Sequence, residues 1–109
     1  MSFFKETQTL YFTDTSERSI YSYHYDEESG DLSSQSTFFR TEERSGPDGH
    51  AVDEEGNLWV AVWGAWKVVC VSPQGKVTAE ITLPTRCITV STLCGTSSLR
   101  LLVTDLIFY

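Results

Sequence analysis

The tripeptide Pro47-Asp48-Gly49 offers the clearest candidate for chemistry in this sequence. A carboxylate held on a short turn is a hard oxygen ligand of the kind that calcium prefers. Pro47 fixes the backbone dihedral at the start of the turn, and Gly49 lets the chain turn back into a following strand. The same tripeptide is also common in plain type I turns. The residues alone therefore leave two readings of Asp48, a metal ligand or a turn without function.

Other acidic residues gather in two short segments, Asp26–Asp31 and Asp53–Glu55. A calcium loop of the Asp-x-Asp-x-Asp-Gly type needs tighter spacing and a distal Glu, and both features are missing. We interpret the two segments as solvated turns. The sequence also contains no nucleophile elbow, phosphate-binding loop, dinucleotide motif or Cys/His dyad.

Three tryptophans, Trp59, Trp63 and Trp66, lie close together. Strand alternation places Trp59 and Trp63 on one face, and the segment 63–66 is expected to be the loop that ends a strand. An aromatic wall for a sugar ring is one interpretation, but packing in the core is favoured.

The cysteines, Cys70, Cys87 and Cys94, are odd in number and form no Cys-x-x-Cys pair. This pattern argues against a disulfide framework and against a structural zinc site, and it favours a reducing, cytoplasmic setting. Cys70 lies in an apolar strand and is expected to be a buried small hydrophobic residue.

The bulk composition excludes several classes of partner. The 109 residues suffice for one domain at most, and 8 basic against 15 acidic residues give a net charge of -7. An acidic surface repels phosphate backbones, so we expect no nucleic-acid partner. The longest apolar run, Leu58–Trp66, is far shorter than the ~20 residues of a membrane-spanning helix, so we expect no membrane association. The N-terminus shows no secretory signal pattern.

Strand signals dominate the chain, and no window shows a sustained helical period, so little helix is expected. The residues between Thr41 and Gly49 have the composition of a polar connector. The expected strands are Leu10–Asp14, Ser19–Tyr25, Thr37–Arg40, Leu58–Val62, Lys67–Val71, Lys76–Ile81 and Leu101–Asp105.

One unit recurs along the sequence. The segments that start at Leu10, Leu58 and Leu101 are similar in character, and their starts lie 48 and 43 residues apart. A period of roughly 40–45 residues with about four short strands is typical of a β-propeller blade. A blade cannot cover its own faces, so neighbouring blades must stack. The alternative is a β-sandwich in which the spacing is a coincidence.

The segment Gly46–Ala61 resembles a signature of the senescence-marker protein, regucalcin and gluconolactonase family. The shared pattern is Pro-Asp-Gly, an apolar pair, Asp, a turn with Gly, and then Leu-Trp-Val-Ala. The upstream stretch Leu10–Thr15 and the downstream stretch Ile81–Pro84 are similar as well, so the resemblance covers nearly the whole chain. It implies an all-β fold in which residues 1–109 form a partial domain, truncated at both ends. That domain is about two blades and part of a third of a six-bladed propeller.

The resemblance also implies a divalent cation in the central channel, calcium first, with zinc or magnesium as alternatives. In the family the ligands are a Glu, two Asn and the Asp of Pro-Asp-Gly, and only the last has a match here, at Asp48. The same carboxylate is then a candidate general base for a water that attacks a sugar lactone. His50 could contact substrate at the mouth of the channel. Asn57, the only asparagine, falls in a turn and not at a ligand position.

Three functions follow from these residues. In the first, the chain is part of a calcium-dependent lactone hydrolase that uses Asp48. In the second, it belongs to a calcium-binding regulator of the same fold that catalyses no turnover. The third is an inactive truncated product, because most of the expected ligands are missing. Open sheet edges also predict self-association.

Overall fold

The computed structural model describes residues 1–83, 88–94 and 100–105, and it is almost entirely β-strand. One 3₁₀ turn, Lys5–Thr7, is the only helical element in that part of the chain, as the sequence predicts. The strands are β1 (Ser2–Phe4), β2 (Thr9–Asp14), β3 (Ser19–Tyr25), β4 (Leu32–Arg40), β5 (Gly46–Val52), β6 (Leu58–Trp63), β7 (Lys67–Val71), β8 (Val77–Thr82), β9 (Ile88–Cys94) and β10 (Arg100–Asp105).

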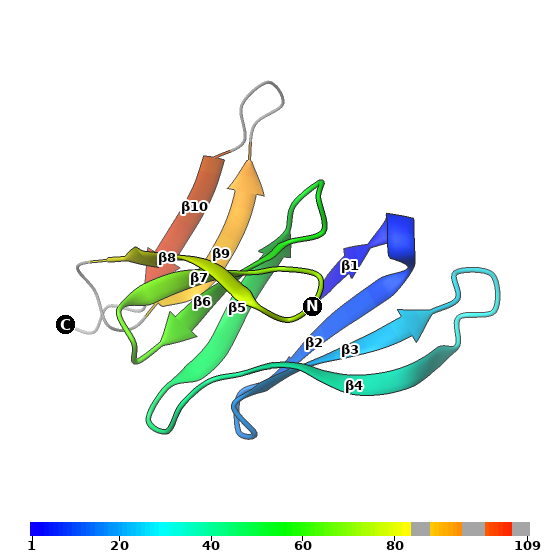
Figure 1. Ribbon diagram of the computed structural model, residues 1–109, viewed down its shortest axis with the longest axis horizontal. Coiled ribbons are helices and arrows are strands. Elements are labelled where there is room, and N and C mark those ends of the chain that lie inside the picture. The colour runs from blue at the N-terminus through cyan, green and yellow to red at the C-terminus, as the bar shows by residue number, and fades with distance from the viewer. Residues whose placement is uncertain (84–87, 95–99, 106–109) are drawn as a thin grey trace.

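The strands form two four-stranded sheets and a hairpin (Figure 1). The first sheet has the order β1-β2-β3-β4, the second has the order β5-β6-β7-β8, and β9 pairs with β10. Every pairing is antiparallel between strands that follow one another in the chain. Each sheet is therefore a meander of the type that builds a propeller blade.

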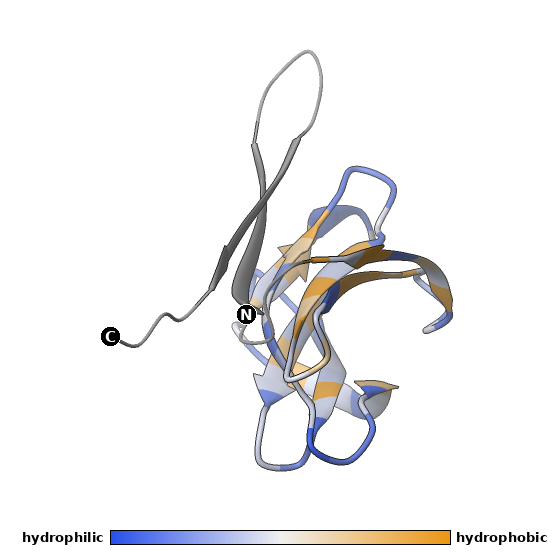
Figure 2. Cartoon of the chain, turned by 90° about the vertical axis from the view of Figure 1, so that its left-hand side faces the viewer, coloured by the Kyte–Doolittle hydropathy of each residue, from blue (hydrophilic) through white to orange (hydrophobic). Residues whose placement is uncertain are grey.

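The main core lies between the two sheets. Tyr11 and Ile20 from the first sheet pack against a row of fully or almost fully buried side chains from β6 and β7. A smaller cluster of Ala61 and Val68 lies on the opposite face of the second sheet. Hydrophobic residues accordingly follow the strands, and hydrophilic residues occupy the loops (Figure 2). The row contributed by the second sheet consists of Leu58, Val60, Val62, Val69 and Val71.

The first strand of each unit lies beside the first strand of the next. β1 contacts β5, and β5 contacts β9. The outermost strands, β4 and β8, are largely exposed. This gradient from covered to exposed strands is expected when blades converge on a common axis, because only the strands near that axis have neighbours on every side.

The repeat predicted from sequence is confirmed at the level of strands. The segments that begin near Leu10, Leu58 and Leu101 are the second strands of the three units, β2, β6 and β10. The expected turn at Asp26–Asp31 connects β3 to β4, where Asp26 N–H donates to Asp31 O and Gly30 N–H donates to Asp26 O.

Two expected boundaries are wrong. β4 begins at Leu32 and not at Thr37. The sequence did not predict its first residues as strand, because they are exposed and carry no hydrophobic alternation. The expected connector Thr41–Gly49 ends early, since β5 begins at Gly46 and includes the Pro-Asp-Gly tripeptide. Strands β1, β5 and β9 are additional to the strands expected from the sequence.

Candidate functional site

Asp48 lies on an irregular part of β5. Pro47 pairs with Val62 and His50 pairs with Val60, so Asp48 and Gly49 together stand opposite a single residue of β6. An extra residue on one strand of an antiparallel pair is a β-bulge, which bends the strand and redirects a side chain. The tripeptide is therefore neither a free loop nor a plain turn. It is a bulge in the first strand of the second sheet.

The Asp48 side chain is partly buried. Burial raises the pKa of its carboxyl group above the ordinary value, and the backbone N–H of Gly49, which donates to the carboxylate, partly offsets this rise. Desolvation disfavours the ionised form, so the carboxylate becomes a better proton acceptor and gains more from a nearby cation. Both properties suit a general base or a metal ligand.

His50 is only 9% exposed and lies between the sheets. Its ring Nδ1 is 2.6 Å from Ser2 Oγ, and Ser2 Oγ also donates to the His50 carbonyl at 3.1 Å. The hydroxyl has one hydrogen, so both contacts are satisfied when Nδ1–H donates to Oγ and Oγ–H donates to the carbonyl. This tautomer leaves Nε2 as an acceptor, and Nε2 is buried with no hydrogen-bond partner among the described residues.

Burial lowers the pKa of His50 to about 4, and the positive charge of the N-terminal amino group acts in the same direction. His50 is therefore neutral at neutral pH. Asp48 and His50 come from the same strand, but His50 packs against β1 through Ser2. Substrate contact by His50 stays a prediction.

Asp53 organises the turn between β5 and β6, as the sequence predicts for this acidic segment. Its Oδ1 accepts from the backbone N–H groups of Glu55 (3.0 Å) and Asn57 (2.9 Å). Its Oδ2 accepts from Asn57 Nδ2 and Trp59 Nε1, both at 3.1 Å. With so many internal donors, Asp53 is a structural residue and not a candidate ligand.

Packing in the core, which the sequence favoured for the tryptophans, holds for Trp59 and is wrong for Trp63 and Trp66, and Trp63 is the last residue of β6 rather than part of the loop. Trp59 packs against the smaller core cluster, whereas Trp63 and Trp66 are 39% and 48% exposed at the turn that follows β6. Cys70 is buried, as expected. Cys87 and the side chain of Cys94 lie outside the described residues.

The donor chemistry of Asp48 fits a hard cation, but the number of ligands does not make a complete site. Calcium takes six to eight oxygen ligands. Among the described side chains, those of residues 1–83, no three His, Cys, Asp or Glu groups gather closely enough to hold a metal ion. Asp48 can therefore supply one carboxylate ligand of a cation site.

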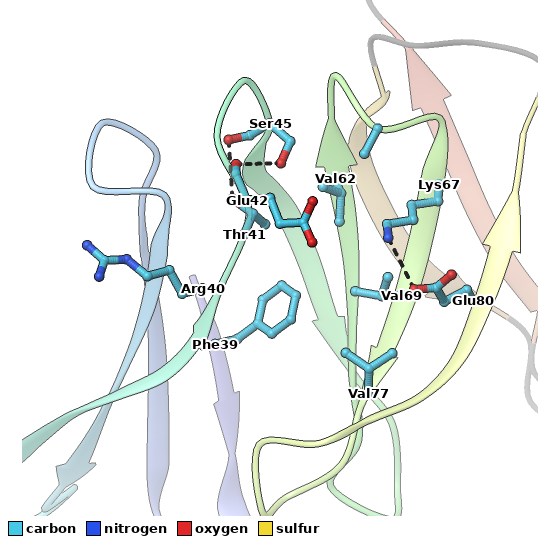
Figure 3. A pocket seen from close by; sticks show the side chains of 11 residues that line it. Phe39, Arg40, Thr41, Glu42, Ser45, Val62, Lys67, Val69, Val77 and Glu80 are labelled. Carbon is cyan, nitrogen blue, oxygen red and sulfur yellow. Dashed lines mark hydrogen bonds and ion pairs between the residues drawn. The ribbon is translucent and has the colours of Figure 1, made fainter.

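A separate pocket of about 270 Å³ lies between β4 and the outer strands of the second sheet (Figure 3). An ion pair between Lys67 Nζ and Glu80 Oε1 at 3.1 Å stands at one side of it. Neither Asp48 nor His50 is among its lining residues, so it is distinct from the candidate site. Its walls include Phe39, Glu42, Val62, Lys67, Val77 and Glu80.

The described part of the chain contains no helix with the length and apolar character needed to cross a membrane.

Repeated antiparallel meanders whose first strands lie side by side define this chain as a β-propeller protein. Residues 1–106 match the family model described as SMP-30/gluconolactonase/LRE-like region. The chain belongs to this family, so the resemblance drawn from its motifs is confirmed.

The relatives include named lactonases and a named calcium-binding protein. Pentonolactonase XacC of Haloferax volcanii is 37% identical over 90 residues, which is 82% of this chain and 31% of that protein. L-arabinolactonase of Azospirillum brasilense is 34% identical over 86 residues, or 78% of this chain and 28% of that protein. The solved structure of the calcium-binding protein regucalcin from Agrobacterium tumefaciens is 30% identical, with a TM-score of 0.84, over 94% of this chain and 36% of that one. The chain thus spans about a third of the length of these relatives.

Proposed function

We propose that this chain is part of a lactone hydrolase that depends on a divalent cation, calcium first, with zinc or magnesium as alternatives. In this proposal Asp48 is both a cation ligand and the general base. The observation that carries it is the partly buried Asp48 carboxylate on the bulge of β5, within the segment typical of a family that includes named lactonases.

The reaction follows from the chemistry of a lactone. The Asp48 carboxylate takes a proton from a water molecule as that water adds to the lactone carbonyl. The ring C–O bond then breaks, the proton passes to the leaving oxygen, and the product is an open hydroxy acid. When bound, a divalent cation would polarise the carbonyl and stabilise negative charge on its oxygen. His50 is proposed as a residue that contacts the substrate.

A second function is a calcium-binding protein of the same fold without turnover. The likeness to a solved protein named as calcium-binding regucalcin favours this alternative. An inactive product is the third, because no cluster of three His, Cys, Asp or Glu side chains is found among the described residues. Turnover that requires the Asp48 carboxylate separates the first function from the other two.

Several related proposals concern the whole molecule. Residues 1–109 are proposed to form part of a larger six-bladed ring, with the sugar lactone as substrate and the cytoplasm as location. Self-association is proposed because β4 and β8 are exposed edges, and because Phe12 and Leu32 are 44% and 51% exposed. Unpaired strand edges and uncovered apolar side chains are the usual causes of association between sheets.

The proposed function can be tested in a hybrid protein. The segment of the A. brasilense L-arabinolactonase that matches this chain is replaced by the corresponding residues of this chain, and hydrolysis of L-arabinolactone is followed with and without a chelator. We expect turnover that the chelator removes. Asp48→Asn should lower kcat by about 10²–10⁴-fold, the usual contribution of a general base.

Glu54→Gln is the matched control, because it makes the same carboxylate-to-amide change at an exposed turn six residues away. It should leave kcat unchanged. Circular dichroism melting verifies that both variants of the hybrid are folded. Full activity of a folded Asp48→Asn hybrid would rule out the proposed role of this carboxylate.

A further inference from the structure

Three hydroxyl side chains from the first unit reach across to the bulge of β5. Thr15 Oγ1 donates to the Pro47 carbonyl at 3.2 Å, and Thr13 Oγ1 donates to the Asp48 carbonyl at 3.4 Å. Ser2 Oγ donates to the carbonyl of His50 at 3.1 Å. Pro47, Asp48 and His50 are the residues that form and flank the bulge. We call Ser2, Thr13 and Thr15 the hydroxyl clamp.

The clamp compensates for what the bulge removes. A bulge disrupts the local ladder of backbone hydrogen bonds, and a backbone carbonyl that is buried without a partner is costly. β5 is the first strand of its sheet, so β6 pairs with it on one side only. Side-chain hydroxyls from the neighbouring unit give the carbonyls partners where the ladder is irregular.

The three clamp residues are held in place by their own surroundings. Ser2 lies on β1, and Thr13 is paired across β2–β3 with Ile20, a residue that is 0% exposed. Thr15 follows β2 and is seated against Gly46, since a Cβ atom at Gly46 would lie 3.1 Å from Thr15 Cγ2. The absence of a side chain at Gly46 is what allows Thr15 to approach the start of β5.

We propose that Ser2, Thr13 and Thr15 are positioning residues that fix the orientation of the Asp48 carboxylate before any cation or substrate arrives. The catalytic value of this orientation rests on the function proposed above for Asp48. The clamp acts on the backbone on both sides of the bulge, so it restricts the dihedral angles that direct the side chain. A site held in its productive geometry in advance does not have to be ordered when it binds.

The test uses the 109-residue chain without metal and the double variant Thr13→Val/Thr15→Val, which removes both hydroxyl groups at nearly constant volume. Three-bond couplings measured by nuclear magnetic resonance report the χ1 angle of Asp48, and hydrogen exchange reports opening at the His50 amide. In the unmodified chain we expect a single Asp48 rotamer. In the double variant we expect averaged couplings and exchange at His50 that is about 5- to 150-fold faster, from the loss of two neutral hydrogen bonds.

The conservative variant Thr13→Ser/Thr15→Ser keeps both hydroxyl groups and should restore the single rotamer. The control variant Ser22→Ala/Ser36→Ala removes an exposed hydroxyl pair whose oxygens lie 2.8 Å apart on β3 and β4, and it should change neither readout. If the double valine variant does not fold, the single variants Thr13→Val and Thr15→Val are measured in its place.

Two results overturn the clamp. One is a folded valine variant, double or single, with an unchanged Asp48 rotamer. The other is a serine variant as disordered at Asp48 as the valine variant, because the retained hydroxyl groups would then not be enough to fix the carboxylate. Neither result depends on metal or turnover, so the clamp can fail while Asp48 remains essential in the hybrid. It can equally hold while Asp48→Asn leaves the hybrid active.

Discussion

Acidification from pH 6.5 to pH 4 should cost the folded chain about 3 kcal/mol through His50 alone. The pKa of this imidazole falls from 6.5 to about 4 on folding, and each unit of pKa difference corresponds to about 1.36 kcal/mol. The physical cause is burial: a ring that is 9% exposed has little water with which to solvate a positive charge.

The direction in which the free energy of unfolding changes with pH follows from proton binding. Between pH 4 and pH 6.5 the unfolded chain carries a proton on His50 and the folded chain does not, so the free energy of unfolding rises with pH across this window. The contribution of neutral His50 to stability is complete above the pKa of the unfolded chain, 6.5, and it is lost as the pH falls toward the pKa of the folded chain, about 4. The raised pKa of Asp48 acts in the opposite direction, because folding favours its protonated form. The lowered pKa of Asp14, caused by hydrogen bonds from Ser16 and Glu17, acts in the same direction as His50, so the contribution of His50 is measured by comparison with a variant that lacks it.

His50→Leu should remove most of this slope, because leucine has no proton to bind. Ser2 would keep its second contact, the backbone carbonyl of position 50. The matched control is His24→Leu, which removes an exposed imidazole from β3. Urea unfolding at pH 4.5, 5.5 and 6.5 measures the effect. Equal pH slopes for the unmodified chain and His50→Leu would show that this imidazole is not buried in its neutral form.

Ile20→Ala should lower the free energy of unfolding by about 2–5 kcal/mol. Ile20 is 0% exposed and belongs to the cluster that joins the first sheet to β6 and β7. Truncation removes apolar contacts and leaves a cavity between two sheets, where the surrounding backbone cannot easily collapse. Because the second sheet packs on this cluster, the loss also weakens the contact between the two units.

Ile81→Ala is the matched control for this prediction. It makes the same chemical change on β8, where the side chain is 39% exposed, and it should cost no more than about 0.5 kcal/mol, as surface substitutions usually do. Urea midpoints with a common slope give the comparison. Similar losses for the two variants would contradict the packing of the sheets through Ile20.

The parts of the fold that sequence could predict are those whose burial leaves a hydrophobic pattern. β6 and β7 are recognisable as continuous apolar runs because both faces of the second sheet carry buried residues, Val60 on one and Ala61 on the other. The first half of β4 could not be predicted, since an exposed edge strand buries nothing and its Ser-rich sequence resembles a loop. β5 was hidden for another reason. Pro and Gly are unfavourable in the interior of strands and occur mainly at sheet edges and bulges.

The residues of the candidate site also differ in whether the sequence could reveal them. Asp48 could be singled out because Pro-Asp-Gly and its flanking residues form a recognisable segment. The hydroxyl clamp could not, because Ser2, Thr13 and Thr15 lie 32 to 48 residues from their partners in the sequence. Serine and threonine are common in strands and turns, so their types carry no signal until the fold brings the two units together. The burial of His50 likewise depends on β1, a strand that the sequence pattern did not reveal.

The most direct test of the account is a calorimetric titration of the hybrid protein with calcium. We expect binding of one ion, and an affinity at least about 10–100-fold lower in Asp48→Asn, since loss of even an outer partner of a metal ligand has an effect of this size. Glu54→Gln should bind as the unmodified hybrid does, and the 109-residue chain alone should bind weakly. A folded Asp48→Asn hybrid that binds calcium as tightly as the unmodified hybrid would contradict the assignment of Asp48 as a ligand.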